Sequence, residues 1–309
     1  MGFDFYFAGT QSPQTTQLLI NLNANILRSY ANDMKSIKAL MELKKEGKYS
    51  GKLFIDSGAF SVHRNGKVLD VDKYIEWLNE NSMYLDYFVQ IDHIPGTFGE
   101  QKKFEHAIES TEKSWENYLY MVSRLKEPYK LIPVFHAPEP YSHLERIVNY
   151  KIGDVYVPYI CLSYPKDGSY DKLKWSWLQS CFSVIKNSNN PNVKVHCLGC
   201  AIKPLLELFP FTSSDATSWL QTSANGGIMT DYGNILMSDR KQNDATNYEN
   251  LPQAAKDKIQ ELAASCGISV DELKSNYKAR SDFNVMHLHK WAAGYEYKGG
   301  TTFKKGGLF

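Results

Sequence analysis

The sequence predicts a (β/α)8 barrel, a TIM barrel, with a small C-terminal appendage. Short apolar runs alternate with longer amphipathic stretches up to about residue 215, which is the pattern of strands and helices in an α/β fold. Eight such pairs fit into residues 1–220, and polar residues follow several of the apolar runs. A doubly wound sheet is the alternative, but no G-x-G-x-x-G motif follows the first expected strand.

The expected elements follow from apolar runs, capping residues and breakers taken in chain order. Pro13 suits the first turn of a helix, Gly47 ends the second helix, and the Pro95-Gly96 pair breaks the chain after the fourth strand. We expect strands at 3–8, 26–30, 53–55, 87–91, 131–135, 155–160, 193–198 and 211–214. We expect helices at 12–22, 33–46, 71–79, 102–125, 140–150, 171–185 and 203–208.

The regular alternation stops after Asp215. Residues 226–238 are typical of a β-hairpin that turns at 231–234, and 251–265 and 270–277 are typical of helices. We therefore expect a catalytic barrel domain at 1–220 and an extension at 221–309.

Bulk composition gives few restrictions on function. Lys plus Arg number 35 and Asp plus Glu number 34, so a nucleic-acid surface would have to be a local patch. The start has no signal-peptide pattern and no run of 18 apolar residues occurs, so we expect a soluble cytoplasmic protein with no membrane partner.

The five cysteines are scattered and odd in number, which argues against a disulfide framework. His196, Cys197 and Cys200 could supply three metal ligands. Adjacent strand residues point to opposite faces, however, and no second C-x-x-C or H-x-H completes a site. Buried strand cysteines are the favoured interpretation, with zinc as the alternative.

The end of the chain is basic and aromatic. Residues 274–309 hold seven Lys or Arg against two acidic residues, with Trp291, Tyr295, Tyr297 and Phe303 between them. This composition suits a phosphate backbone and unstacked bases. A solvated helix followed by a frayed tail explains it equally well. The residues expected to bind a polynucleotide are Arg280, Lys290, Lys298, Lys304 and Lys305.

Three carboxylates end expected barrel strands, namely Asp56, Asp92 and Asp215. A single aspartate at such a position is more often a cap or turn residue, but three of them favour a site. One carboxylate can attack an anomeric carbon, a second can move the leaving group's proton, and a third can accept hydrogen bonds from a base. Composition and spacing do not identify the substrate.

A resemblance to a known family suggests that substrate. Residues 56–61, D-S-G-A-F-S, resemble the D-S-G-G-[FY]-Q motif of the tRNA-guanine transglycosylases, base-exchange enzymes with a (β/α)8 barrel. Residues 87–92 and 132–136 are similar to two strands of that family, and 196–199 with 204–207 are similar to its L-x-G-x-G-x-P-x-D-L-L-E segment. The resemblance covers about residues 50–220.

The resemblance implies a role for each matching residue. Asp215 would be the nucleophile at C1′ of the nucleotide, and Asp56 would be the general acid and base. Asp92 and Ser57 would bind the base edge, and Phe60 would stack on the base.

The resemblance also implies which residues would form the walls of the base pocket. Gly58 would let the backbone approach the base closely. His136 stands where the family has a glutamine, and residues 159–163, including Cys161 and Leu162, replace its G-G-L-A-x-G wall. These departures affect the base that the pocket would accept.

The family's C-terminal zinc motif, C-x-C-x-x-C with a histidine, is absent, because only Cys266 follows residue 200. This pattern looks like that of phage-type relatives, which exchange guanine in DNA for a 7-deazaguanine such as preQ0. The leading hypothesis is therefore a DNA-guanine transglycosylase without a cofactor, whose partners are DNA and the free base, in the host cytoplasm if phage-encoded. The alternatives are a zinc-free tRNA-guanine transglycosylase and an inactive barrel that only binds nucleic acid.

Overall fold

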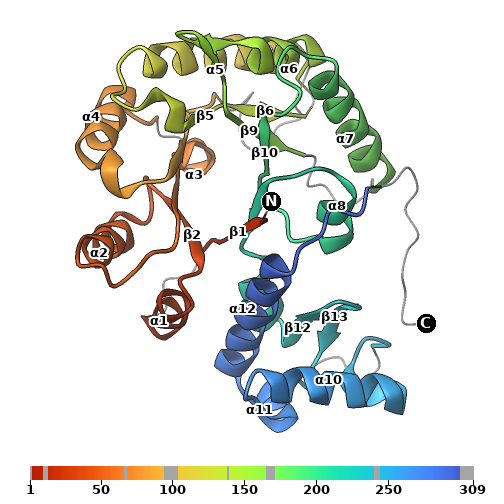
Figure 1. The fold of residues 1–309 in the computed structure, drawn as a ribbon. Helices are drawn as coiled ribbons and strands as arrows, with labels where there is room; N and C mark the ends of the chain where they lie inside the picture. The colour runs from red at the N-terminus through yellow and green to blue at the C-terminus, as the bar shows by residue number, and fades with distance from the viewer. Residues whose placement is uncertain are drawn as a thin grey trace. The chain divides into compact units, whose positions relative to one another are not determined.

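The fold is a parallel, nearly closed barrel-shaped sheet with helices around it, as the sequence predicts (Figure 1). The computed structural model describes residues 2–9, 13–65, 68–93, 104–137, 139–164, 171–239 and 244–299. Within these residues the main sheet has nine strands in the order β5-β4-β3-β2-β1-β11-β10-β9-β6. They are β1 (Asp4–Phe7), β2 (Asn25–Ser29), β3 (Leu53–Asp56), β4 (Tyr87–Val89), β5 (Leu131–Ile132), β6 (Val134–His136), β9 (Tyr159–Ser163), β10 (Lys194–Cys197) and β11 (Ser213–Ala216).

The sheet closes through a strand that Pro133 divides. β5 pairs with β4, whereas β6 pairs with β9, and only Pro133 separates β5 from β6. Proline has no N–H to donate to a ladder, so the strand expected at 131–135 is interrupted there. Its carbonyl still accepts a hydrogen bond from Cys161 N at 2.8 Å. The two ends of the sheet order are thus consecutive in the chain.

The strand expected at 155–160 is wrong. β7 (Lys151–Ile152) and β8 (Val155–Tyr156) form a separate antiparallel hairpin instead, and the barrel strand β9 begins only after Pro158. Gly153 occupies the hairpin turn with φ of +60°, a conformation that favours glycine. A turn residue and a proline therefore divide what looked like one apolar run.

Most helices lie where the sequence predicts them. They are α1 (Pro13–Asn21), α2 (Met34–Lys45), α4 (Val71–Asn81), α5 (Phe104–Val122), α6 (Tyr141–Asn149), α7 (Asp171–Lys186), α8 (Lys203–Leu208), α10 (Gln253–Ser265) and α11 (Val270–Ser275). The hairpin of β12 (Gly227–Thr230) and β13 (Gly233–Leu236) is also as predicted. Three helices were not predicted, namely α3 (Ala59–Arg64), α9 (Ser218–Ala224) and α12 (Tyr277–Ala293). Among the described helices, none is long and apolar enough to cross a membrane.

The chain forms two compact units. The middle unit comprises Asn25–Leu198 with Phe211–Ser213, and the terminal unit comprises Met1–Ala24, Gly199–Pro210 and Ser214–Phe309. In the middle unit, helices α2 and α4 to α7 lie on the outer side of the strands (Figure 1). The fully buried Phe54, Phe88 and Phe135 come from its strands. The domain boundary expected at residue 220 stays a prediction.

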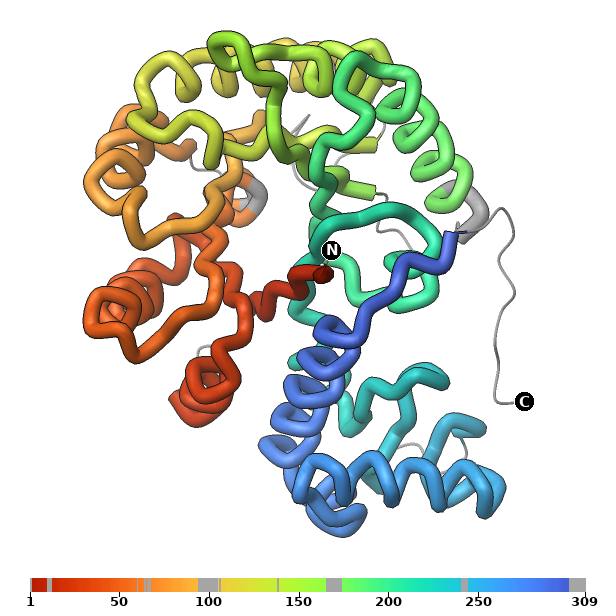
Figure 2. Tube along the Cα trace, in the orientation of Figure 1, coloured from red at the N-terminus to blue at the C-terminus, as the bar shows by residue number. Residues whose placement is uncertain are grey.

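The terminal unit joins the two ends of the chain. Helix α12 packs against β1, α1, α9 and β12, so residues from both ends lie side by side (Figure 2). A hydrophobic cluster ties the hairpin to α10, α11 and α12, with Ile228, Leu273 and Phe283 fully buried in it. Helix α12 is therefore part of the packed core of this unit.

Candidate functional site

The turn after β3 is built around Asp56 and Gly58. Gly58 N donates to Asp56 Oδ2 at 3.1 Å, and Ala59 N donates to Ser57 Oγ at 3.3 Å as α3 begins. The backbone carbonyl of Asp56 also accepts from Tyr30 N at 2.8 Å. These bonds fix the half-buried Asp56 carboxylate at the carboxyl end of its strand.

Gly58 is required by the turn itself. Its φ is +81°, and a Cβ there would lie 2.5 Å from Ser29 Oγ and 2.7 Å from Ala31 Cβ. Both the left-handed backbone and the nearby side chains exclude a larger residue. The resemblance implied that this glycine lets a base approach closely, whereas the turn itself already requires it.

Asp92 and His136 come together after β4 and at the end of β6. Asp92 Oδ2 and His136 Nε2 are 2.7 Å apart, with 12% and 24% of the two side chains exposed. A carboxylate can only accept a hydrogen bond, so Nε2–H of His136 is the donor. Both residues were predicted to contribute to the base pocket, and the structure places them in direct contact with each other.

Helix α5 anchors the segment that carries Asp92. Asn117 Nδ2 donates to Ile91 O at 3.1 Å, His93 N donates to Ser114 Oγ at 2.8 Å, and Ser110 Oγ donates to His93 O. These bonds hold the backbone on both sides of Asp92. The Asp92 carboxylate is thus held on a fixed backbone. The neighbouring His93 is partly buried, which lowers the pKa of its imidazole.

Glu139 is a site residue that the sequence analysis missed. Its Oε2 accepts from His136 N at 2.8 Å, while Glu139 N donates to His136 O at 2.8 Å. The side chain is only 6% exposed, and burial raises the pKa of its carboxyl group. The sequence feature that could have identified Glu139 is its position, three residues after the strand-end histidine and at the expected start of a helix.

Asp215 is the last residue but one of β11, and it belongs to the terminal unit. It is 6% exposed, and Gly199 N donates to its Oδ1 at 2.7 Å. The backbone amide therefore orients the carboxylate. The Gly199 that supplies this amide belongs to residues 196–199, the segment that resembles a family motif.

Three expected base contacts are not on an accessible surface. Ser57, Cys161 and Leu162 are all 0% exposed, which is contrary to the expected side-chain contact with a base. Ser57 Oγ instead accepts the hydrogen bond from Ala59, and Cys161 and Leu162 lie in β9 between β10 and β6. The backbone of Phe60 lies in α3, but its side chain is outside the described part of the structure.

The cysteines show no metal-binding arrangement. All five are free, and Cys161, Cys197 and Cys200 are fully buried. His196 is also fully buried, where its Nδ1 lies 2.5 Å from Ser213 Oγ and its ring packs edge-on against Phe54. Across the described residues, no group of three His, Cys, Asp or Glu could hold a metal ion.

The expected polynucleotide-binding residues have different surroundings. Arg280 is 7% exposed and donates to the carbonyls of Ser223, Leu273 and Lys274, so the expected surface contact is wrong for this residue. Lys290 is exposed, and Lys298 is exposed but pairs with Glu207 Oε2 at 2.7 Å. Lys304 and Lys305 lie outside the described residues.

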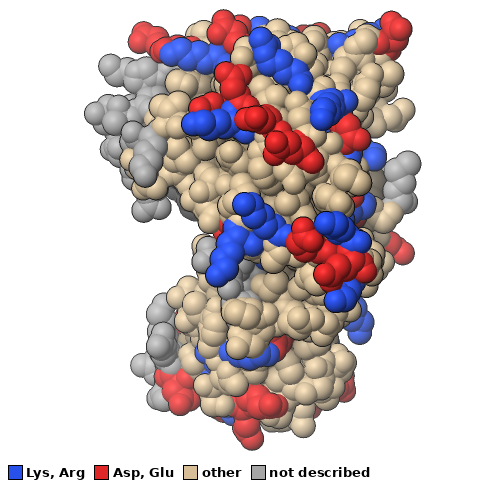
Figure 3. Space-filling model, turned by 90° about the vertical axis from the view of Figure 1, so that its left-hand side faces the viewer, with Lys and Arg blue, Asp and Glu red and all other residues tan. Residues whose placement is uncertain are grey.

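The aromatic residues of the same segment are largely committed to packing. Tyr295 stacks on Phe3 with ring centres 4.4 Å apart, and Trp291 Nε1 donates to Glu207 Oε1 at 2.9 Å. These rings therefore join the two ends of the chain. On the face drawn in Figure 3, basic and acidic side chains are interspersed.

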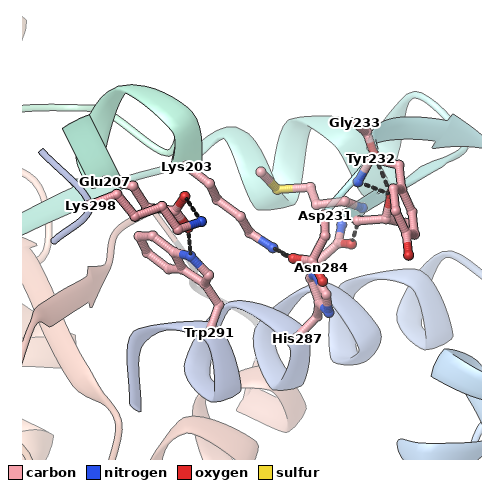
Figure 4. Close-up of polar contacts among 11 residues, drawn as sticks. Lys203, Glu207, Asp231, Tyr232, Gly233, Asn284, His287, Trp291 and Lys298 are labelled. Atoms are coloured by element: carbon pink, nitrogen blue, oxygen red, sulfur yellow. Dashed lines mark hydrogen bonds and ion pairs between the residues drawn. The ribbon is translucent and has the colours of Figure 1, made fainter. Parts of the chain in front are cut away.

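A second cluster of charged groups lies inside the terminal unit. Lys203 Nζ donates to Asp231 Oδ1 at 2.7 Å and lies 2.6 Å from His287 Nε2 (Figure 4). Burial lowers the pKa of Lys203, and the neighbouring His287 and Lys203 side chains hold the pKa of Asp231 well below its usual range. The cluster ties α8, the hairpin turn and α12 together.

Neither protein-family models nor curated proteins yield a match to this sequence.

Proposed function

We propose that this chain is a guanine transglycosylase that exchanges a guanine of DNA for a 7-deazaguanine base. The observation that carries the proposal is the contact between Asp92 and His136 at the carboxyl ends of two barrel strands. This is the end of the barrel at which active sites of the fold lie. Asp92 offers carboxylate oxygens to the N–H groups of a guanine-type base, which is the role that the family resemblance gives it.

The proposed reaction uses two further strand-end carboxylates. Asp215 attacks C1′ of the nucleotide, and the bond between C1′ and N9 breaks with its electron pair leaving on guanine. Asp56 gives the departing base a proton. The incoming base then returns its N9 proton to Asp56 and attacks C1′, which breaks the bond to Asp215. Two inversions retain the configuration, and no oxidant or reductant is needed.

The surroundings of these residues support the assignment. The amide of Gly199 holds the Asp215 carboxylate in one orientation, as a nucleophile requires, and the amide of Gly58 does the same for Asp56. DNA is the proposed polynucleotide because the family motif that binds zinc, and that helps dock tRNA, has no counterpart in the sequence.

Base exchange with labelled guanine tests the proposal. The protein is incubated with labelled guanine and either double-stranded DNA or tRNA, and label in the polynucleotide is measured after precipitation. We expect incorporation into DNA. Incorporation only into tRNA would favour the zinc-free tRNA enzyme, and polynucleotide binding without incorporation would favour an inactive barrel.

The nucleophile is tested by Asp215→Asn. We expect this variant to lose exchange and to form no denaturant-stable adduct with DNA, because an amide cannot form the ester to C1′. Asp154→Asn makes the same chemical change at an exposed turn of the middle unit and serves as the matched control. An adduct that persists in Asp215→Asn would show that another residue is the nucleophile.

A further inference from the structure

Glu139 is a buried carboxyl group beside the Asp92–His136 pair, and the reaction described above does not use it. It belongs to the turn between β6 and α6, where it closes a ring with His136. The amide of each residue donates to the other at 2.8 Å, Glu139 accepting with its side chain and His136 with its carbonyl. The strand-end histidine is therefore held through its own backbone.

We propose that Glu139 is a positioning residue that sets both the orientation and the charge of His136 within the base-recognition pair. The inference rests on the proposed function for the identity of the ligand, a guanine-type base. Its structural part, the control of His136 by Glu139, is independent of any activity.

The contacts of Glu139 support the orienting role. Its carboxyl group accepts from the amide of the residue that carries the imidazole, so it limits the backbone rotation that would move Nε2 away from Asp92. Thr111 on α5 lies close enough to Glu139 to lower the pKa of its carboxyl group. The same helix anchors the segment of Asp92 through Ser110, Ser114 and Asn117. One helix therefore supports both members of the pair.

The charges around His136 support the second role. The ionisable groups that face it are Asp92 after β4, Glu139 in the turn and His143 on α6. Both carboxyl groups favour the imidazolium, whereas a charged His143 would oppose it. The pKa of Glu139 is raised by burial and by Asp92, but His136 acts in the opposite direction. The attraction between Glu139 and His136 is mutual, so a charged Glu139 must favour a charged His136.

The proposed consequence concerns base recognition. An imidazolium that donates Nε2–H to Asp92 holds that carboxylate in the orientation in which it can accept from the donors of a base. Glu139 would thus control how strongly the pair holds a base without contacting the base itself. Glu139→Gln keeps a side-chain oxygen that can accept from the amide of His136 but removes the negative charge. The variant therefore tests the effect of the charge while the hydrogen bond is retained.

Titration of the histidine side chains by NMR tests the proposal in the full-length protein. The imidazole signals of His136 are first assigned as those that are missing from the spectrum of His136→Asn. We expect Glu139→Gln to lower the pKa of His136 by about one unit, as removal of a nearby negative charge requires. Glu145→Gln, the same change at an exposed position of α6, should leave it unchanged. An unchanged pKa of His136 in Glu139→Gln would overturn the proposal.

Addition of guanine to the same samples separates this proposal from the proposed function. We expect guanine to shift the His136 signals in the wild-type protein, and the Kd for guanine to rise about tenfold in Glu139→Ala, which lacks the acceptor for the His136 amide. If guanine shifts no signals but Glu139→Gln still lowers the pKa of His136, the positioning role stands and the assigned ligand is wrong. If Glu139→Ala binds guanine as tightly as the wild-type protein, Glu139 does not position the pair.

Discussion

His143 on α6 lies in surroundings that keep its imidazole neutral. The side chain is buried at 3% exposure among the rings of Trp115 and Phe135. Arg146 Nη2 lies 2.9 Å from His143 Nδ1, so this nitrogen accepts from the guanidinium and cannot also carry a proton. Burial, followed by the charge of Arg146, lowers the pKa of His143 to about 4.

This lowered pKa predicts a loss of stability in mild acid. Unfolding restores the ordinary pKa of about 6.5, so the unfolded chain binds more protons than the folded one between pH 6.5 and about 4. The contribution is fully present above pH 6.5 and is lost as the pH falls through that window. Its full size is about 3 kcal/mol, of which about 2 kcal/mol is lost between pH 7 and pH 5.

His143→Asn removes the titration and keeps the acceptor. The amide oxygen of asparagine can accept from Arg146 as Nδ1 does, although the smaller side chain loses ring contacts and lowers the stability at pH 7. We expect the fall in unfolding free energy between pH 7 and pH 5 to be about 2 kcal/mol smaller in the variant than in the wild-type protein.

Urea denaturation followed by tryptophan fluorescence measures this difference, and Trp115, whose ring centre is 5.9 Å from that of His143, reports on the region directly. His63→Asn makes the same substitution at a half-exposed site on α3 and shows whether loss of any histidine has this effect. Equal pH dependence in His143→Asn and the wild-type protein would refute the reasoning.

Two further substitutions test the packing around the carboxylate turn and the buried lysine. Gly58→Ala should lower the unfolding free energy by about 2–4 kcal/mol because it adds both left-handed strain and a clash. Gly47→Ala, at φ of +69° with no atom within 4 Å of the added Cβ, should cost only about 1–2 kcal/mol, and an equal cost for both would contradict the clash. Asp231→Asn should cost about 1–3 kcal/mol at pH 7, because Lys203 loses its counter-charge while Asp231 is itself 56% exposed. Asp239→Asn, at an exposed position beyond the same hairpin, is the control in thermal denaturation. An equal loss of stability in this control would show that the cost does not come from the lost partner of Lys203.

The barrel could be predicted from the sequence because the patterns that define its strands and helices lie within short stretches of the chain. Each strand is a short apolar run, and each helix carries an apolar stripe and a start or stop signal, so the β/α alternation appears before any contact is known. The same local patterns placed Asp56 at the end of a strand, Asp215 one residue before a strand end and Asp92 just beyond one. The hairpin at Gly227–Leu236 followed from its turn residues for the same reason.

Other features depend on contacts between distant residues. Nothing local to Pro133 shows that the residues on its two sides pair with different strands and so close the sheet. Arg280 and Trp291 belong to a basic, aromatic segment, yet one caps buried carbonyls and the other joins the two ends of the chain. Their burial is set by partners far away in the sequence, which composition cannot reveal.

The candidate site divides along the same line. The residue types at the strand ends could be read from the sequence, because the barrel fold itself makes strand ends the place for chemistry. The 2.7 Å contact between Asp92 and His136, and the buried Glu139 behind it, required the tertiary structure. Side-chain pairing and burial depend on how β4, α5 and α6 pack together, and no spacing along the chain encodes that arrangement.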